Sequence, residues 1–376
     1  MLDAKDFIGR DQLLIKRSID TLYENIIIRQ SKDQQFAFDD YRAVVPSPRT
    51  YKGVWNWDSA FHMMAFSRLD PAIGKDQMRI LFDYQKEDGQ IADVIYSTGK
   101  TVFEFTKPPV LAWAIMVNDK ISPDLTFLEY AFPHLLSNLK WWEINRYDGT
   151  LFGYKVHKME SGWDDTVRFD KPHVIENCYA IDANCFMVTF YDAMIYISEK
   201  LGKSSESFKH QRRRLINKIN EFLYDSENHY YCDYDQVLHS FTHRLSPASF
   251  MPLFVHIANA EQAEAMMQLA KNSEYFYKGI PTISYNQEAY SPRKFWRGPT
   301  WLNTSYFTIR GLYDYGFKDL ALDLTENMLD WCYKNKRSIR EYYHSKTGKG
   351  LGAKNFGWSA AFLIEFVLLK NGKLDW

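Results

Sequence analysis

Helix-length segments follow one another along almost the whole chain, and this pattern constrains the fold more than any other feature. Apolar residues recur at helical spacing between breakers, whereas strand-like alternation is scarce. The predicted helices span residues 10–30, 56–68, 72–86, 107–119, 122–146, 176–201, 204–223, 246–258, 260–271, 299–315, 318–334 and 357–370. Twelve helices suit six hairpins that alternate between the inner and outer layers of a closed barrel. The sequence therefore predicts an all-α fold, a single (α/α)6 barrel, with strand candidates only at 150–157 and 229–234.

Longer connections separate the predicted helix pairs, and they carry the unusual residues. They span residues 31–55, 87–106, 147–175, 224–245, 272–298 and 335–356. A closed helical barrel would bring several of them to one end and form a cleft there. No Gly/Ser-rich linker or shift of composition marks a boundary, so residues 1–376 are predicted to form one domain.

Composition and charge exclude several classes of protein. Hydrophobic residues are 46% of the chain and aromatic residues 16%, which is enough for a large packed core. A formal net charge of -1 gives no reason to expect a nucleic-acid partner. No apolar run reaches the length of a membrane span, and the charged N-terminal residues lack the core of an export signal, so we expect a cytoplasmic protein without a membrane partner. The oligomeric state is not indicated.

Cysteine and histidine spacings favour neither a metal nor a cofactor. The four cysteines form no C-x-x-C pair, so buried free thiols are expected. The histidines lack zinc-binding spacings, and no phosphate-binding loop follows a strand. We therefore predict no metal and no cofactor.

The first carboxylate motif is the segment Glu160-Ser161-Gly162-Trp163-Asp164-Asp165. Three acids within six residues repel one another, and a neighbouring indole restricts water, so the pKa of one acid would rise and suit it to proton donation. Asp164 is the candidate. The alternative, at about even odds from this segment alone, is that Asp164 or Asp165 caps the following turn.

The second motif is Glu341-Tyr342-Tyr343, ahead of a glycine-rich stretch. Its alternative interpretation is a surface acid paired with Arg340. Because Asp164 and Glu341 both lie in long connections, a helical barrel could bring them face to face. Inversion of a glycosidic bond needs one carboxylic acid to protonate the leaving oxygen and a second carboxylate, roughly 6.5 to 9.5 Å away, to activate water.

Two further segments combine aromatic and polar groups, as sugar recognition requires, because sugars stack their C–H faces on rings and hydrogen-bond through their hydroxyls. They are 51–62, which reads Y-K-G-V-W-N-W-D-S-A-F-H, and 295–301, which reads F-W-R-G-P-T-W. The structural alternatives are an N-cap role for Asp58, core packing for the tryptophans and a helix start at Pro299.

Taken in order, these segments resemble glycoside hydrolase family 63 and its trehalase-like relatives, which are inverting α-glycosidases with an (α/α)6 barrel. The resemblance covers about residues 50–365 and implies a glycoside hydrolase with Asp164 as general acid and Glu341 as general base. The sugar-binding candidates, from the matching positions and their motifs, are Tyr51, Trp55, Trp57, Asp58, His62, Lys107, Trp163, Trp296, Arg297 and Trp301.

Two departures from the family bear on the substrate. Thr106-Lys107-Pro108-Pro109 has a lysine where relatives often have glutamine, and Gln90-Ile91-Ala92-Asp93 also differs from its counterpart. Lys107 would contact an acidic leaving group or pair with a pocket carboxylate, and the second interpretation is at least as well supported.

The leading hypothesis is an inverting α-glycosidase that acts on a small α-glucoside or α-mannoside, of the disaccharide or sugar-glycerate type. The alternatives are a sugar epimerase or isomerase on a helical toroid, which would need paired histidines, and a non-catalytic carbohydrate-binding protein. The expected partner in each case is a small carbohydrate.

Overall fold

The computed structural model describes residues 1–29, 36–171, 174–276 and 278–376. Its contacts group into two compact units, which are described separately. Unit 1 comprises Met1–Asn145, Thr189–His210 and Ala353–Trp376, and unit 2 comprises Arg146–Val188 and Gln211–Gly352. The boundary runs through α6 (Ile181–Lys200), α7 (Glu206–Phe222) and β10 (Gly350–Lys354). The single-domain organisation stays a prediction.

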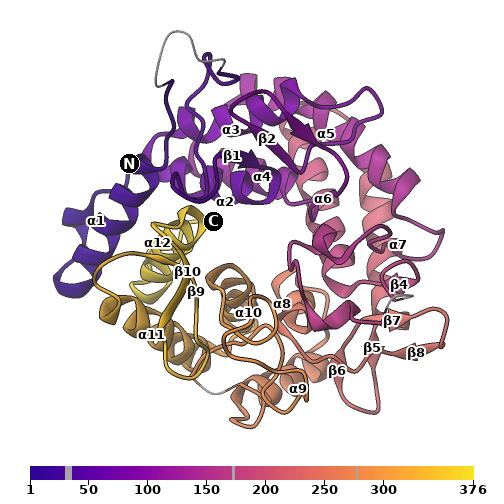
Figure 1. Cartoon of the computed structure of the whole chain (residues 1–376). Coiled ribbons are helices and arrows are strands. Elements are labelled where there is room, and N and C mark those ends of the chain that lie inside the picture. Colours follow the sequence, from indigo (N-terminus) through magenta and orange to yellow (C-terminus); the bar gives the residue numbers. More distant parts are fainter. Residues whose placement is uncertain (30–35, 172–173, 277) are drawn as a thin grey trace. The chain divides into compact units, whose positions relative to one another are not determined.

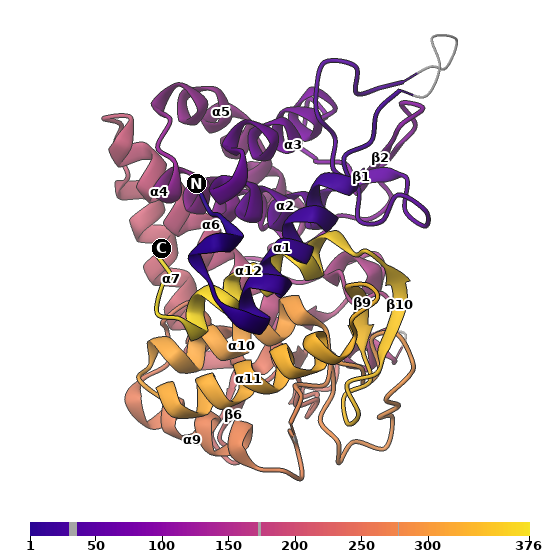
Figure 2. The same cartoon turned by 90° about the vertical axis from the view of Figure 1, so that its left-hand side faces the viewer.

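Unit 1 is built on helices that differ in how much of their surface is buried. They are α1 (Gly9–Glu24), α2 (Asn56–Leu69), α3 (Pro71–Asp83), α4 (Leu111–Ile121), α5 (Leu125–Asn145) and α12 (Gly357–Lys370). Every residue of α2 is buried, whereas α1 buries one stripe and lies against α12 (Figure 2). Helix α2 packs against α3, α4 and α12. Fully buried helices beside amphipathic ones are the pattern of two helical layers.

A small antiparallel sheet in unit 1 holds the segment that leads into α2. Its strands are β1 (Gly53–Trp55), β2 (Val94–Tyr96) and β3 (Thr101–Val102), with Trp55 opposite Val94. Figure 1 shows β1 and β2 beside α2. The amide of Asn56 donates to the carbonyl of Asp93. This register brings Asp93 next to the start of α2.

Unit 2 combines four whole helices, besides parts of α6 and α7, with short strand pairs. The helices are α8 (Met251–Phe254), α9 (Ala260–Lys271), α10 (Leu302–Asp314) and α11 (Lys318–Lys334), and α10 packs against α8 and α11. One sheet has the order β4 (Cys178–Tyr179), β7 (Tyr234–Asp235), β8 (Ser240–Phe241), while β5 (Tyr224–Asp225) pairs with β6 (Tyr230–Tyr231) and β9 (Arg340–Tyr343) with β10. Four 3-10 helices complete the described chain: η1 (Ala4–Asp6), η2 (Lys158–Ser161), η3 (Val167–Phe169) and η4 (Pro247–Phe250).

The helix predictions are largely confirmed, since 260–271, 318–334 and 357–370 agree with α9, α11 and α12 at both ends. Three were wrong at one end: α1 stops at Glu24, α4 starts only after the Pro108-Pro109 pair, and α6 starts after β4, whose strand pairing overrides local helix preference. The predicted helix 246–258 is instead η4 followed by α8, because Pro252 lacks the N–H that a continuous helix needs.

The strand candidates fared less well. Residues 150–157 form only an isolated bridge between Tyr147 and Phe152, whereas 229–234 overlaps β6 and the start of β7.

The expectation of buried free thiols is confirmed, because Cys178, Cys185, Cys232 and Cys332 are all free and buried. Of the helices within the described residues, none is both long and apolar enough to cross a membrane.

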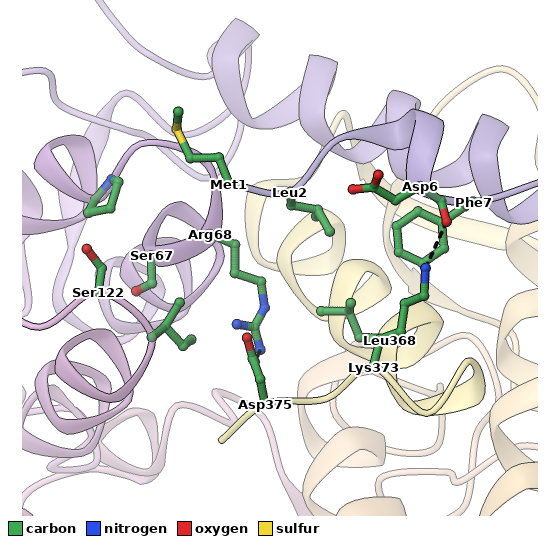
Figure 3. Close-up of a pocket in the computed structure, with 12 residues that line it drawn as sticks. Met1, Leu2, Asp6, Phe7, Ser67, Arg68, Ser122, Leu368, Lys373 and Asp375 are labelled. Atoms are coloured by element: carbon green, nitrogen blue, oxygen red, sulfur yellow. Dashed lines mark hydrogen bonds and ion pairs between the residues drawn. The ribbon is translucent and has the colours of Figure 1, made fainter.

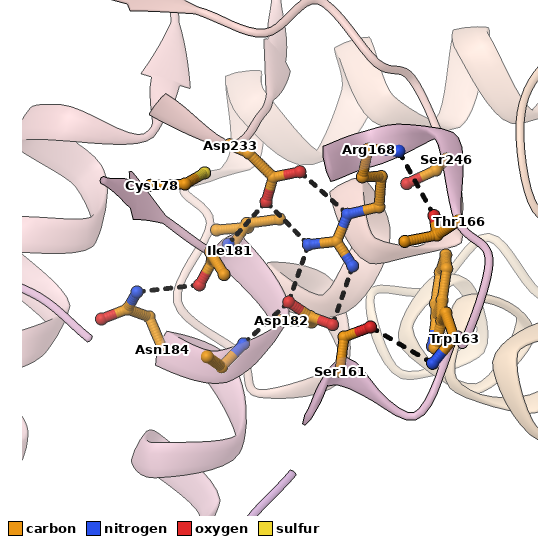
Figure 4. Close-up of polar contacts among 12 residues, drawn as sticks. Ser161, Trp163, Thr166, Arg168, Cys178, Ile181, Asp182, Asn184, Asp233 and Ser246 are labelled. Atoms are coloured by element: carbon orange, nitrogen blue, oxygen red, sulfur yellow. Dashed lines mark hydrogen bonds and ion pairs between the residues drawn. The ribbon is translucent and has the colours of Figure 1, made fainter. Parts of the chain in front are cut away.

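A buried ion cluster anchors the long connection before α6 (Figure 4). The Arg168 guanidinium donates to both carboxylate oxygens of Asp182, at 2.7 and 2.8 Å, and of Asp233, also at 2.7 and 2.8 Å. All three side chains are at most 2% exposed. Although burial alone would lower it, the two aspartates raise the pKa of Arg168 well above its ordinary value. The cluster therefore ties η3 to the start of α6 and to the residue before β7.

Replacing Arg168 by Met should lower the free energy of unfolding by about 3 to 5 kcal/mol, because two buried carboxylates would lose their shared cation. Urea denaturation measures the change. The matched control is Arg213→Met, which removes the same charge from an exposed position on α7 and should cost less than about 0.5 kcal/mol. Equal stability losses in the two variants would contradict an anchoring role for the cluster.

Candidate active site

Asp164 lies in a turn that we call the acid loop, Lys158–Asp170, which runs from η2 to the end of η3. Gly162 ends η2 in the left-handed conformation, with φ 76°, and reverses the chain before Trp163. Thr166, rather than either aspartate, caps η3 through its side chain. Asp164 and Asp165 are partly exposed, whereas Trp163 before them and Thr166 after them are buried. The side chain that caps η3 is therefore that of Thr166, and neither Asp164 nor Asp165 is the N-cap of this helix.

Glu160 does not take part in the acid crowding that the sequence suggested. Its carboxylate is fully buried, forms a short ion pair with Arg146 and accepts hydrogen bonds from the amides of Lys155 and Val156. These donors compensate its negative charge. Glu160 is therefore paired with a cation and two amides rather than left as an uncompensated third acid.

The other two acids of the loop bind the segment Phe295–Trp301, which we call the indole segment. The Asp165 carboxylate accepts from the amide of Trp296 at 2.7 Å. Arg297 donates to both oxygens of Asp170, at 2.7 and 2.6 Å, and to the carbonyl of Asp165. The hydrogen bond from Arg297 holds the pKa of Asp170 below its usual value. Arg297, predicted to line the sugar site, is thus engaged with the acid loop.

Glu341 lies on β9 and is 3% exposed. Tyr343, two residues on, exchanges both backbone hydrogen bonds with Thr300 of the indole segment. Gly352 lies directly against the carboxylate, since a Cβ atom there would be 2.4 Å from Oε2 of Glu341. Its φ of +65° is also unfavourable for any residue with a side chain. Glu341 is therefore a buried carboxylate rather than a surface acid.

Four aromatic rings connect the acid loop to β9. Trp163 stacks on Trp296 with centroids 5.6 Å apart, Trp296 stacks on Trp301 at 3.8 Å, and Trp301 stacks on Tyr342 at 4.7 Å. Trp163 directly precedes Asp164, and Tyr342 directly follows Glu341. Burial, and next the charges of Glu341 and Asp165, raise the pKa of Tyr342. The residues next to the two sequence-predicted acids, Trp163 and Tyr342, are therefore joined to the same segment.

The sugar-binding candidates of unit 1 surround the start of α2. Tyr51 and Trp55 are partly exposed and meet edge to face at 5.6 Å. Trp57 is 2% exposed and packs against Phe61 and Trp358, as a core anchor would. Rings at β1 thus remain accessible while the next tryptophan is part of the core.

Asp58 and His62 lie within the first two turns of α2. Asp58 is 6% exposed and does not cap the helix, because the N-cap is Trp55. His62 is fully buried, and a Cβ atom at Gly357 would be 2.2 Å from its Nε2. Burial lowers the pKa of His62 to about 3, so the ring is neutral at physiological pH. It lies beneath α12 rather than at an accessible surface.

Lys107 and Asp93 form an ion pair, with Nζ 3.6 Å from Oδ1 and both side chains 7% exposed. The two departures from the family pattern therefore face each other. The separation exceeds a normal hydrogen bond, so the pair is held by charge rather than by a tight contact. Because Asp93 adjoins Asn56, the lysine lies close to the aromatic entry of α2.

A cavity of about 520 Å³ in unit 1 contains none of the motif residues (Figure 3). Arg68 lines it, and its guanidinium pairs with the buried Glu365 and with Asp375. Both acids compensate the arginine, so this cavity is not the candidate active site.

Sequence reasoning missed three contributors. Tyr342 was read only as part of a motif, although its ring completes the stack. Arg168 gave a weak signal, a lone charge in the apolar run Val167-Arg168-Phe169, and Asp93 was noticed without its lysine partner. None of these pairings follows from spacing along the chain.

The described fold matches several solved enzymes. The mannosylglycerate hydrolase of glycoside hydrolase family 63 from Thermus thermophilus, in complex with glucose, superposes with a TM-score of 0.81 at 23% identity, covering 94% of this chain and 100% of that one. The neutral trehalase Nth1 from Saccharomyces cerevisiae has a TM-score of 0.73 at 19% identity, covering 88% of this chain and 74% of that one. These likenesses confirm the predicted (α/α)6-barrel fold class.

The relatives and the family model give the class of enzyme and then the family. The mannosylglycerate hydrolase from Rubrobacter radiotolerans is 23% identical over 86% of this chain and 92% of its own length, and one from Thermus thermophilus is 25% identical over 85% and 95%. The chain is a glycoside hydrolase. Residues 51–359 match the mannosylglycerate hydrolase MGH1-like glycoside hydrolase domain, and the chain belongs to that family.

Because the sequence predicts Glu341 to be the general base, replacing Gly352 by Ala should lower kcat by about 100-fold: the new methyl group would displace the Glu341 carboxylate. Gly202→Ala is the matched control, since Gly202 has the same φ of +65° but nothing within 4 Å of the added Cβ. Both variants should lose about 1 kcal/mol of stability from the backbone conformation. Equal kcat values for the two variants would contradict a catalytic role for a Glu341 carboxylate positioned against Gly352.

Proposed function

We propose that the enzyme hydrolyses a small α-mannoside or α-glucoside with inversion, with Asp164 as general acid and Glu341 as general base. The observation that carries the proposal is that one segment, Phe295–Trp301, bonds to the loop of one acid and to the strand of the other. This chemistry requires two carboxyl groups held at a fixed separation, and a segment bonded to both regions of the chain could hold them so.

The two environments suit the proposed roles. Asp164 is partly exposed and directly follows Trp163, which is 3% exposed, and restricted access of water beside an indole is the setting that the proposal requires for a proton donor. In the reaction it would protonate the glycosidic oxygen as the bond to the anomeric carbon breaks. Glu341 would take a proton from water as that water attacks the opposite face of the sugar.

The proposed substrate carries an acidic leaving part of the glycerate type. Relatives in the family are named mannosylglycerate hydrolases, and a solved relative contains Tris and D-glycerate. In this chain Lys107 would supply the cation for such a carboxylate. The sugar-contact roles of Tyr51, Trp55, Trp57, Asp58 and His62 remain predictions from their motif, as does the cytoplasmic location.

Separate Asp164→Asn and Glu341→Gln variants should each lose about 10²- to 10⁴-fold in kcat, because each removes one proton transfer. The substrate is first chosen by a hydrolysis screen of mannosylglycerate, glucosylglycerate, trehalose, kojibiose and nigerose. Asp323→Asn and Glu326→Gln, which neutralise exposed acids on α11, are the controls and should keep the parental rate. Parental rates in the Asp164 and Glu341 variants would refute the assignments.

The first product observed by proton NMR should be the β-anomer of the released sugar, because inversion of an α-glycoside gives the opposite configuration. An initial α-anomer would instead require a retaining mechanism. The same spectra test the other functional classes, since hydrolysis yields two species, an epimerase or isomerase yields one sugar, and a binding protein gives no turnover.

Lys107→Gln should reduce kcat/KM for glycerate-type substrates by roughly 10- to 100-fold and change neutral disaccharides little, because it removes one charged hydrogen-bond donor. The discriminating variant is Lys107→Gln combined with Asp93→Asn. If Lys107 only neutralises Asp93, the double variant regains activity and thermal stability on all substrates. If the double variant regains kcat/KM on the glycerate-type substrates, that result would contradict a contact between Lys107 and the leaving group.

A further inference from the structure

Trp296 and Trp301 are each only 1% exposed, although the motif suggested that they line the sugar site. Their rings stack on each other with an angle of 5° between the planes, and each has another ring on its outer face. A sugar could stack on either ring only by displacing a neighbouring side chain. Their burial therefore calls for a role other than contact with substrate.

The ring stack ends on either side next to a proposed reacting group. Trp163 forms the end beside Asp164, and Tyr342 forms the end beside Glu341. Interplanar angles of 13°, 5° and 23° keep the four rings nearly parallel. Aromatic rings in a packed interior deform little, so the thickness of the stack fixes how far apart its two ends lie.

Backbone bonds repeat the same connection independently of the rings. On the acid side, the Trp296 amide donates to the Asp165 carboxylate at 2.7 Å. On the base side, the amide and carbonyl of Thr300 exchange hydrogen bonds of 2.8 and 2.9 Å with Tyr343. The indole segment is thus fixed to the acid loop at one end and to β9 at the other.

We propose that the indole segment is a spacer that sets the separation between the carboxyl groups of Asp164 and Glu341, and that Trp296, Trp301 and Tyr342 are positioning residues. The inference rests on the proposed function, because it takes these two groups as acid and base. It goes further by assigning the stereochemical geometry to three stacked rings, of which Trp296 and Trp301 are buried and Tyr342 is partly exposed.

The separation matters because it decides whether a water molecule fits between the sugar and the base. Inverting enzymes need room for that water, whereas retaining enzymes bring the two carboxyl groups to roughly 5 to 5.5 Å. A displacement of about 1 Å costs roughly 100-fold in rate when groups must be aligned. Loosening one end of the spacer should therefore harm one proton transfer more than the other.

The test compares two substrates and the two ends of the spacer. Asp165→Ala removes the acceptor of the Trp296 amide and loosens the acid end, while Tyr342→Leu removes the ring at the base end. Each is assayed on the glycoside found by the screen and on the α-fluoride of the same sugar. In the fluoride the C–F bond breaks without protonation, fluoride leaves as an anion, and only the water that adds to the anomeric carbon must give up a proton.

Asp165→Ala should lower kcat on the glycoside by about 100-fold. It should lower kcat on the fluoride by about 10-fold or less, because departure of fluoride needs no general acid. Tyr342→Leu should lower kcat on both substrates by about 100-fold, since it displaces the base. Tyr342→Phe keeps the ring and should recover most of that loss. KM should change little in all three variants, and the melting temperature, measured in parallel, reports any general destabilisation.

The spacer proposal would be overturned if Asp165→Ala lost the same factor in kcat on both substrates. It would also be overturned if Tyr342→Leu kept the parental kcat. A third contrary result would be kcat losses that simply follow the fall in melting temperature across the three variants, on both substrates. These failures differ from failure of the proposed function, in which Asp164→Asn or Glu341→Gln would retain activity or the wild-type enzyme would release the α-anomer first. Should Tyr342→Leu fail to fold, the comparison of Asp165→Ala on the two substrates still decides the acid end.

Discussion

The fixed connection between two distant stretches of chain is the constraint on which the candidate site depends. The acid loop and β9 are far apart in the sequence, yet both are bonded to the indole segment, one through Asp165 and the other through Thr300. A stack of flat rings backs up these hydrogen bonds. Hydrogen bonds orient the indole segment relative to the acid loop and β9, and the stacked rings set the distance between them. Together they hold the two stretches in place more firmly than either would alone.

Arginine side chains determine which carboxylates remain available for chemistry. Arg146 neutralises Glu160, Arg297 binds Asp170, and Arg168 holds two aspartates at once. Each arginine neutralises the acid or acids that it binds, which are then poor candidates for catalysis, and it also holds the loop that carries them. The guanidinium of Arg168 also lies 5.1 Å from the ring of Trp163, so the ion cluster supports the end of the ring stack. Charge compensation and site geometry are thus parts of one arrangement.

Helix positions could be predicted well because helical periodicity is a local signal. The capping box of Asn259 and Gln262, for instance, starts α9 at the residue expected. The site could be predicted only as a set of residue types: the motifs identify Asp164 and Glu341 but do not reveal that Glu160 is consumed by Arg146, that Trp301 is buried, or that Lys107 meets Asp93. Those facts are long-range pairings, and a single sequence carries no local trace of them. The aromatic composition correctly indicated an enzyme that acts on sugars. Most tryptophans of the motifs are nevertheless buried and pack within the protein instead of lining an open surface.

The most direct measurement is a crystal structure of the Glu341→Gln variant with its intact glycoside bound. The account predicts that the side-chain oxygens at positions 164 and 341 lie roughly 6.5 to 9.5 Å apart, on opposite faces of the sugar, with a water molecule between position 341 and the anomeric carbon. A separation near 5 Å without that water, or a sugar bound away from both side chains, would contradict it.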